Sequence, residues 1–255
     1  MVCGSVRGLS TLLAQVVCSR KSIATRARDE PEKILILFGD SNFYYCPRSF
    51  FARLLGRFWS RDSVADLVHA QLPGRTILFS LSSIDYRVST LVTLETVLET
   101  LLSMNPSTIV SILVLTGQND ADHFSRRSTR NAHEIRAQYR ELIQKKATEL
   151  ENHIGKFPQV KIYWVVPFDD PRATFAPLYN DLVCDLKEEI RSRTRILEFG
   201  PFTSFEDDQY HLNTDDRQLF ASQLLEWFAN STAIGQRHLE NQGPALRRSG
   251  KSLLL

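Results

Sequence analysis

The hydrophobic and polar positions of the chain alternate between two patterns. Five short runs are almost continuously apolar and rich in β-branched or aromatic residues, which is typical of strands covered on both faces. These runs span residues 33–38, 75–80, 108–115, 160–166 and 194–199. Between and after them lie longer segments in which apolar residues recur every three or four positions, as in amphipathic helices. The helical segments span residues 60–72, 87–104, 132–154, 175–193 and 214–229.

Strand-like and helix-like segments alternate along the chain, which predicts an α/β fold. We expect a three-layer α/β/α arrangement with a five-stranded parallel sheet and helices on both faces. We place this domain at residues 32–230, after a disordered or targeting leader at residues 1–31 and before a flexible basic tail at residues 231–255. Its last helix should have Thr214 or Asp215 as its N-cap. Ligands of such folds bind beyond the carboxyl ends of the strands, so we expect the chemistry there.

The composition is that of an ordinary globular protein, because 43% of the 255 residues are hydrophobic and 24% are charged. The formal net charge of +2 is unevenly spread, since residues 1–30 and residues 231–255 each carry a net charge of +3. The residues between them are therefore mildly acidic, which gives no argument for nucleic-acid binding, and we expect no nucleic-acid partner. No run of 18 apolar residues occurs, so no membrane-spanning helix is expected.

The leader and the cysteines bear on the cellular compartment. Residues 1–28 contain Arg and Ser but no acidic residue, which is typical of a mitochondrial transit peptide and equally compatible with a disordered leader. The four cysteines are Cys3, Cys18, Cys46 and Cys184. They include no C-x-x-C pair and no metal-ligand spacing, so we interpret them as free thiols in a reducing compartment. We therefore expect an intracellular protein, either cytoplasmic or, if residues 1–30 are a transit peptide, mitochondrial.

Ser41 is the first candidate for chemistry, because it follows Gly39 and Asp40 at the end of the first predicted strand. Gly39 permits a tight turn that would place the serine hydroxyl at the rim of the sheet. A serine hydroxyl is a weak nucleophile until a base removes its proton. Without such a base, Ser41 is simply a residue that caps a helix after the strand.

His211 is the candidate base among the six histidines. It lies in the sequence FEDDQYHLNTDD, just before the last predicted helix, and Asp208 lies three residues upstream. Within a turn, this spacing can bring the Asp208 carboxylate to Nδ1 of the imidazole, where it fixes the tautomer and stabilises the imidazolium. Asp207 is an alternative to Asp208, since a shift of one residue would exchange them. The other interpretation of His211 is an exposed loop histidine near acids.

Asn119 is a candidate hydrogen-bond donor after the third predicted strand, in the sequence TGQND. A side-chain amide at this place can donate to the oxyanion of a tetrahedral intermediate, and one such donor is worth about 3 to 4 kcal/mol. A Gly-x-Asn-Asp sequence also forms ordinary turns, so the motif alone does not distinguish the two roles.

Together these motifs resemble those of the SGNH (GDSL-type) hydrolase family over about residues 33–229. The matching sequences are GDSN, GQND and DQYHLN, and PLYNDLV resembles a helix of the same family. The resemblance implies a flavodoxin-like fold and a Ser-His-Asp triad that acts on esters without a metal or other cofactor. It assigns Ser41 as the nucleophile, His211 as the base and Asp208 as the orienting acid. The N–H of Ser41 and the side chain of Asn119 would belong to the oxyanion hole.

One motif departs from the family pattern, in which a glycine after the second strand supplies another oxyanion N–H. Here that loop reads SLSSIDYRVST and contains no glycine. Any residue except proline carries an N–H, so Ser83 or Ile84 can replace it, and Ser83 is included in the predicted hole. A side chain there can still narrow the pocket or prevent the required backbone conformation. Asp120, which follows Asn119 in the TGQND sequence, is expected to brace its loop rather than to react.

The sequence therefore predicts a serine esterase or acyl hydrolase that cleaves a small ester or acylated substrate through an acyl-enzyme. The missing glycine motivates an alternative, a catalytically impaired SGNH-like domain that binds or scaffolds without turnover. The resemblance includes a retroelement origin for this alternative, because SGNH-like domains also occur inside retroelement-derived proteins. A nucleotide-binding protein is disfavoured, because no G-x-G-x-x-G or G-x-x-x-x-G-K-[ST] sequence follows any predicted strand.

Overall fold

The structure, a computed structural model, describes residues 32–44, 63–81, 83–126, 131–171, 176–206 and 210–240. Its centre is a five-stranded sheet in which all neighbouring strands are parallel, in the order β2-β1-β3-β4-β5. This is the strand order of flavodoxin-like doubly wound proteins, and it confirms the predicted fold. The strands are β1 (Lys33–Gly39), β2 (Thr76–Ser80), β3 (Ile109–Leu115), β4 (Val160–Val165) and β5 (Ile196–Leu197).

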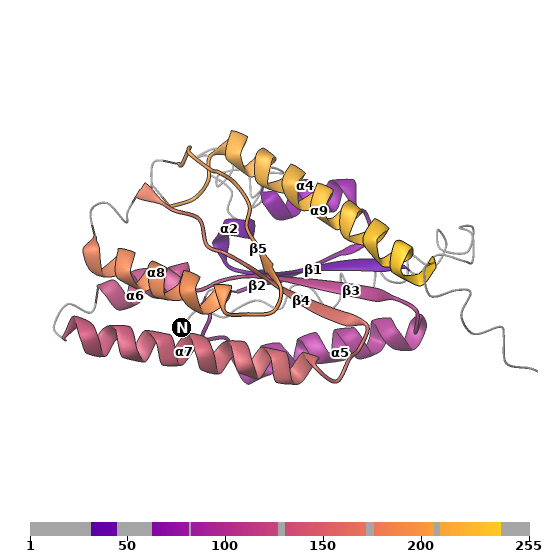
Figure 1. Cartoon of the computed structure of the whole chain (residues 1–255), viewed down its shortest axis with the longest axis horizontal. Helices are drawn as coiled ribbons and strands as arrows, with labels where there is room; N and C mark the ends of the chain where they lie inside the picture. Colours follow the sequence, from indigo (N-terminus) through magenta and orange to yellow (C-terminus); the bar gives the residue numbers. More distant parts are fainter. Residues whose placement is uncertain are drawn as a thin grey trace, which may run out of the picture.

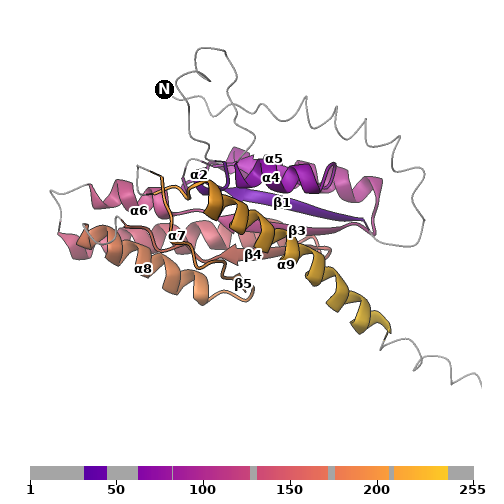
Figure 2. The ribbon, with the colours of Figure 1, turned by 90° about the horizontal axis from the view of Figure 1, so that it is seen from above.

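Helices cover both faces of the sheet (Figure 1). The core on one face is formed with α5, α6, α7 and α8, and the core on the other with α2, α4 and α9. Figure 2 looks down on the second face and shows α9 running diagonally across the strands. The five predicted helices are present, and short helices also follow β1 and β3. The helices are α2 (Ser41–Tyr44), α4 (Val64–Gln71), α5 (Val88–Met104), α6 (Gln118–Ser125), α7 (Ala132–Ile154), α8 (Pro177–Arg191) and α9 (Thr214–Glu240).

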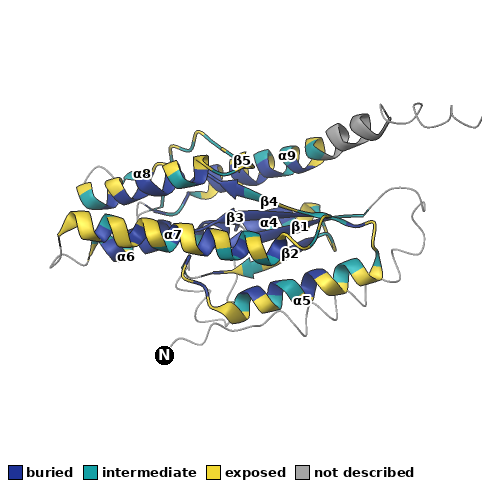
Figure 3. Ribbon diagram, turned by 60° about the horizontal axis from the view of Figure 1, so that its bottom comes forward, coloured by how far each residue is buried: buried dark blue, intermediate teal, exposed yellow. Residues whose placement is uncertain are grey.

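The central strands are apolar at nearly every position because both of their faces are covered. Along β1, Ile34, Ile36 and Phe38 join the core formed with α5, α7 and α8. Leu35 and Leu37 point the other way and join the core formed with α4 and α9. Figure 3 shows these strands buried between helices whose outer surfaces are exposed.

The two edge strands depart from this pattern. On β2 the side chain of Leu78 is 39% exposed, because β2 has a neighbour on one side only. The predicted strand at residues 194–199 is too long, since only Ile196 and Leu197 pair with β4. The chain turns away soon afterwards, at Gly200, which has a left-handed φ of +117°. Apolar residues after β5 pack against other side chains instead of pairing with β4, as Phe199 does against the ring of Phe220.

The N-terminus of α9 differs from the prediction by one residue. The helix begins at Thr214, and the side chain of Asn213 accepts a hydrogen bond from the N–H of Asp216 at 3.0 Å. The carbonyl of Asn213 accepts the first helical hydrogen bond, from the N–H of Arg217 at 2.9 Å. Asn213, rather than Thr214 or Asp215, therefore caps the helix.

The chain ends lie outside the part of the protein that the structure describes. This applies to the predicted leader at residues 1–31 and to residues 241–255, whereas α9 continues to Glu240, beyond the predicted domain end at residue 230. Among the described residues, no helix is long and apolar enough to cross a membrane. The same residues include no group of three or more His, Cys, Asp or Glu side chains that could hold a metal ion.

Candidate active site

Ser41 is the first residue of α2 and lies directly beyond the carboxyl end of β1. The N–H of Asp40 donates to the carbonyl oxygen of Leu115 at 2.9 Å, which ties the end of β1 to the end of β3. A Cβ on Gly39 would collide with the same carbonyl oxygen and would lie 2.6 Å from the ring of Phe43. Glycine is needed here because the backbones of β1 and β3 pack closely. The structure thus gives Gly39 a packing role that the sequence analysis did not predict.

An aromatic cluster brings the start of α9 to the same edge of the sheet. Phe220 of α9 stacks on Phe43 of α2 with a centroid distance of 5.8 Å. The ring of Phe220 also contacts Phe168, which follows β4, and Phe202, at centroid distances of 5.3 and 5.5 Å. Because these rings join α2 and α9, the residues near the start of both helices become neighbours.

His211 lies next to Ser41 in the folded chain. Its Nε2 is 2.9 Å from the Ser41 Oγ, a hydrogen-bond distance between residues 170 positions apart in the sequence. The ring of Tyr210 packs edge-on against the imidazole at a centroid distance of 4.5 Å. The Tyr210 hydroxyl also accepts a hydrogen bond from Nδ2 of Asn42 at 3.3 Å. Asn42 and Tyr210, the chain neighbours of Ser41 and His211, are thus bonded to each other. This bond helps to fix the position of the Ser41 hydroxyl relative to the imidazole.

The segment that carries His211 is closed at its base. Phe205 and Leu212 form an antiparallel bridge, and the N–H of Glu206 donates to the carbonyl oxygen of His211 at 2.8 Å. Residues 207–209 lie inside this segment but outside the described residues. The choice between Asp207 and Asp208, and the role of Asp208 as the orienting acid, therefore stay predictions.

Arg217, in the first turn of α9, forms hydrogen bonds to residues on both sides of His211. The residue is 1% exposed, and its guanidinium donates to Oε1 of Glu206 at 2.7 Å, to Oγ1 of Thr214 at 3.0 Å and to the carbonyl oxygen of Leu212. A buried cation is tolerated only where its donors are satisfied, and these partners flank His211 on both sides. The sequence analysis did not find Arg217, because an arginine near a helix start gives no sign of burial.

Asn119 lies in the helix α6, so its sequence does not form the ordinary Gly-x-Asn-Asp turn that was the alternative interpretation. Gly117 precedes α6 with a left-handed φ of +110°, and a Cβ there would lie 2.9 Å from the side chain of Leu186. This glycine therefore starts α6 at the carboxyl edge of the sheet, with Asn119 as the second helical residue and its side chain half-buried.

Ser83 lies in the loop between β2 and α5, and Asp120 of α6 holds that loop. One carboxylate oxygen of Asp120 accepts from the Ser83 hydroxyl, and the other accepts from the N–H of Ile84 at 2.7 Å. Within the described residues, the N–H groups of Ser41 and Ser83 and the side-chain amide of Asn119 donate to no other protein group. These three donors at the carboxyl edge of the sheet are therefore available to bind a ligand oxygen. The N–H of Ile84 is not available, because it is already bonded to Asp120.

Asp120 has the environment of a structural support. The pKa of Asp120 is raised above the usual value for a carboxyl group, because the effect of burial outweighs that of the hydrogen bonds from Ser83 and Ile84, which lower it. Both carboxylate oxygens are engaged by the loop after β2. Asp120 therefore braces the loop after β2, a partner that the sequence analysis did not specify.

Gln118 links three strand ends, and the sequence analysis did not find it either. Its Oε1 accepts from Nδ2 of Asn42 at 3.3 Å, and its Nε2 donates to the carbonyl oxygen of Phe168 at 3.0 Å and to Asp170 at 3.3 Å. Tyr179, from the PLYNDLV sequence in α8, donates to the same carboxylate. This buried network joins the segments after β1, β3 and β4 into one polar support.

Comparison with known proteins finds similar solved structures but no match by sequence alone. No family model matches the sequence, and no curated protein matches it. A solved lipolytic protein of the G-D-S-L family from Veillonella parvula is 12% identical, with a TM-score of 0.46 over 77% of this chain and 98% of that chain.

Two solved esterases are similar to the same extent. Est24, a carbohydrate acetylesterase from Sinorhizobium meliloti, is 17% identical, with a TM-score of 0.44 over 78% of this chain and 99% of that chain. The inhibitor-bound aryl esterase of M. smegmatis is 15% identical, with a TM-score of 0.44 over 78% of this chain and 99% of that chain. Such values do not carry an activity from one protein to another, so the function has to be inferred from the residues of this chain.

Proposed function

We propose that the chain is a serine hydrolase that cleaves carboxylic esters, with Ser41 as the nucleophile and His211 as the general base. The observation that carries this proposal is the 2.9 Å distance between the Ser41 Oγ and the His211 Nε2. A serine hydroxyl and an imidazole at this distance form the pair that nucleophilic catalysis requires. They meet at the carboxyl edge of a doubly wound sheet, where such folds bind ligands.

The chemistry follows from the positions of these two groups. As the Ser41 Oγ attacks the ester carbonyl carbon, His211 takes the hydroxyl proton through Nε2 and then returns it to the departing alcohol oxygen. Water attacks the resulting acyl-enzyme in the same way, and the acid is released. In this proposal Asp208 accepts the Nδ1–H of His211 and stabilises the imidazolium.

The proposed oxyanion hole consists of the N–H groups of Ser41 and Ser83 and the side-chain amide of Asn119. It is supported by the absence, within the described residues, of other acceptors for these three donors. The N–H of Ile84 is bonded to Asp120, which favours Ser83 over Ile84 as the donor from the glycine-free loop. Donors that are fixed before the reaction stabilise the charge that develops on the carbonyl oxygen.

Replacing Asn119 with alanine tests this proposal. We expect kcat for p-nitrophenyl acetate to fall by about 10²–10³-fold, as one oxyanion donor is lost. Asn152→Ala is the matched control, because Asn152 is exposed on α7 and makes no hydrogen bond within the described residues. Equal turnover by Asn119→Ala and the wild type would remove Asn119 from the oxyanion hole.

Replacing Arg217 with methionine tests whether its buried guanidinium positions His211. We expect kcat for p-nitrophenyl acetate to fall by about 100-fold with little change in KM, because a displacement of a catalytic group by about 1 Å has an effect of this size. Glu206→Gln is a milder variant that keeps the arginine, and it should lower kcat by a smaller factor.

The control for this experiment is Arg191→Met, which removes an exposed ion pair with Glu198. A folded Arg217→Met protein with wild-type kcat would show that the guanidinium supports only the fold.

The alternative function is a catalytically impaired domain that binds acylated ligands or acts as a scaffold. The observation that favours it is the glycine-free loop, whose residues Ser83 and Ile84 are both held by Asp120. The two functions differ in turnover. If folded wild-type protein hydrolyses none of the p-nitrophenyl esters from acetate to octanoate, the alternative is the better account.

A further inference from the structure

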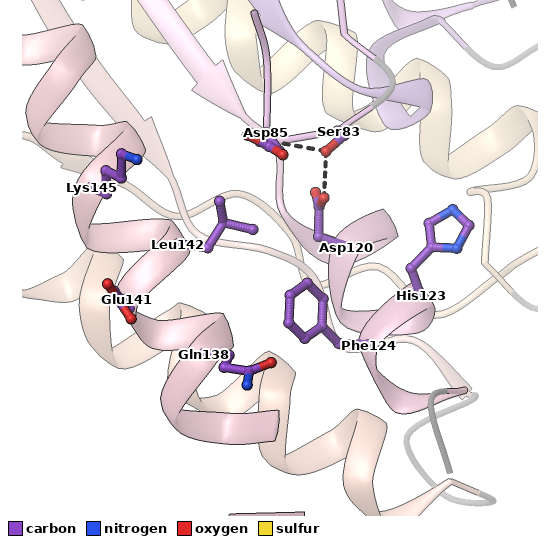
Figure 4. Close-up of a pocket in the computed structure, with 9 residues that line it drawn as sticks. All are labelled: Ser83, Asp85, Asp120, His123, Phe124, Gln138, Glu141, Leu142 and Lys145. Atoms are coloured by element: carbon purple, nitrogen blue, oxygen red, sulfur yellow. Dashed lines mark hydrogen bonds between the residues drawn. The ribbon is translucent and has the colours of Figure 1, made fainter. Parts of the chain in front are cut away.

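The loop between β2 and α5, which carries the proposed Ser83 donor, has an open pocket on one side. The pocket has a volume of about 480 Å³, and its walls come from this loop, from α6 and from α7 (Figure 4). In the part of the chain that the structure describes, Ser83 and Asp85 therefore border open space rather than closely packed side chains. A segment with few packing contacts depends on hydrogen bonds and ion pairs for its conformation.

The first residues of the loop are held by a turn and by α6. The Ser83 hydroxyl accepts from the N–H of Asp85 at 2.8 Å and donates to Asp120, as the dashed lines in Figure 4 show. The other carboxylate oxygen of Asp120 accepts from the N–H of Ile84 at 2.7 Å. The serine side chain thus closes a short turn, and α6 anchors that turn at one end.

Lys146 of α7 holds the next residues of the loop. Its ammonium group donates to the carbonyl oxygen of Tyr86 at 3.0 Å and forms an ion pair with Asp85 at 3.3 Å. The Tyr86 hydroxyl donates in turn to the carbonyl oxygen of Lys146. Burial raises the pKa of this hydroxyl above its usual value, so the hydroxyl keeps its proton and remains a donor. Reciprocal hydrogen bonds therefore join the loop to α7.

The burial of Lys146 is best explained by these contacts with the loop. The residue is 8% exposed, and a buried ammonium group is tolerated only where its partners offset the loss of water. Its third partner is Glu149 of the same helix, at 3.2 Å. That pair alone would need no burial, because residues three positions apart can pair on the surface of a helix. The partners Asp85 and Tyr86 therefore account for the buried position.

The same residues fix the loop relative to the strand that leads to the nucleophile. The ring of Tyr86 packs edge-on against Phe38 of β1 at a centroid distance of 5.5 Å, and Phe38 lies three residues before Ser41. At the start of the loop, the N–H of Leu81 donates to the carbonyl oxygen of Gly39 at 2.6 Å. The contact with Lys146 thus bears on the position of the loop beside the end of β1.

We propose that Lys146 is a positioning residue for the oxyanion hole, because from α7 it holds the glycine-free loop in the conformation that presents the Ser83 N–H to the substrate carbonyl oxygen. The inference rests on the proposed esterase function, and Lys146 acts through the loop rather than on the substrate. A donor that is fixed before the reaction stabilises the developing charge, and a displacement of about 1 Å has a large effect on the rate. Contacts from α6 and α7 would thereby compensate for the missing glycine.

Replacing Lys146 with methionine tests this proposal, because the change removes the ammonium group and keeps an unbranched apolar side chain. We expect kcat for p-nitrophenyl acetate to fall by about 10–100-fold, with KM changed by less than about threefold, since the donor acts in the transition state. Hydrogen exchange followed by mass spectrometry supplies a readout without turnover. The amides of Ile84 and Asp85 should exchange at least about tenfold faster than in the wild type, because the loop opens more often.

Arg193→Met is the matched control, since Arg193 is also a largely buried cation with two carboxylate partners and an aromatic ring beside it. Its guanidinium pairs with Glu151 of α7 at 3.0 Å and with Glu189, and it lies over the ring of Trp164. Removing either cation should lower the midpoint of urea unfolding. Only the loss of Lys146 should lower kcat and speed the exchange of the loop amides.

Tyr86→Phe is a second variant, which decides the question if Lys146→Met does not fold. It keeps the buried ring and removes only the hydroxyl that donates to the Lys146 carbonyl oxygen. We expect the same changes to a smaller extent, with kcat lowered by about 3–10-fold, as suits the loss of one hydrogen bond.

Wild-type kcat in a folded Lys146→Met protein, or in Tyr86→Phe, would overturn the proposal. An equal loss of kcat in Arg193→Met, a rise in KM in place of the fall in kcat, or unchanged exchange of the Ile84 and Asp85 amides would overturn it as well. If the wild type hydrolyses no ester, the proposed function fails, while the exchange rates still decide whether Lys146 holds the loop.

Discussion

Replacing Ser41 with alanine should reduce ester hydrolysis by about 10⁴-fold or more, because the change removes the atom that attacks the carbonyl carbon. The protein should remain folded. Among the described residues, the Ser41 Oγ contacts only the imidazole of His211 by a hydrogen bond, and the loss of one such bond at a half-buried serine changes stability by about 1 kcal/mol. The measurements are p-nitrophenyl acetate turnover and the midpoint of urea unfolding.

Ser89→Ala is the matched control for this variant. Ser89 is exposed on the first turn of α5, and its side chain makes no hydrogen bond within the described residues, so its replacement should leave turnover unchanged. If Ser41→Ala hydrolyses the ester as fast as the wild type, an acyl-enzyme at Ser41 is wrong, whatever the fold of the domain.

Replacing His211 with glutamine should have an effect of similar size, about 10⁴-fold. Glutamine is polar and can hydrogen-bond to the Ser41 hydroxyl, but it cannot take up the proton during attack. His133→Gln is the control, because His133 is an exposed histidine at the start of α7.

The double variant Ser41→Ala/His211→Gln distinguishes a joint role from two separate roles. Groups that act as a unit are not additive, so the double variant should hydrolyse the ester no more slowly than either single variant, within about a factor of ten. A loss equal to the product of the two single effects would mean that the residues act independently, and it would contradict the proposed pair.

Local patterns predict the parts of the fold in which hydrophobicity alone decides the structure. The run at residues 33–38 is apolar throughout because β1 is buried on both faces, and residues 132–154 form a helix with the predicted bounds. The sequence QNDADHFS of α6 has little apolar periodicity, so this helix depends on the left-handed Gly117 and its packing against Leu186. At the sheet edge, β5 is shorter than its apolar run because the chain turns away at Gly200.

The candidate site was predictable where chemistry restricts the choice of residue. A reactive serine needs a base, which leads to His211, and the structure places the two side chains 2.9 Å apart. Arg217 and Gln118 were missed because their roles depend on partners that only the folded chain brings near. The choice of Ser83 over Ile84 needed the contact with Asp120, which is equally invisible in the sequence.

The most direct test of the central claim is covalent labelling with a fluorophosphonate, followed by mass spectrometry to locate the adduct. Attack by an activated serine oxygen on phosphorus displaces fluoride, so the reagent reports a nucleophile and its base without any assumption about the natural ester. We predict one adduct, on Ser41, that forms at least about 100-fold more slowly in His211→Gln. An adduct on another residue, or equally fast labelling of Ser41 in the absence of the imidazole, would contradict the account.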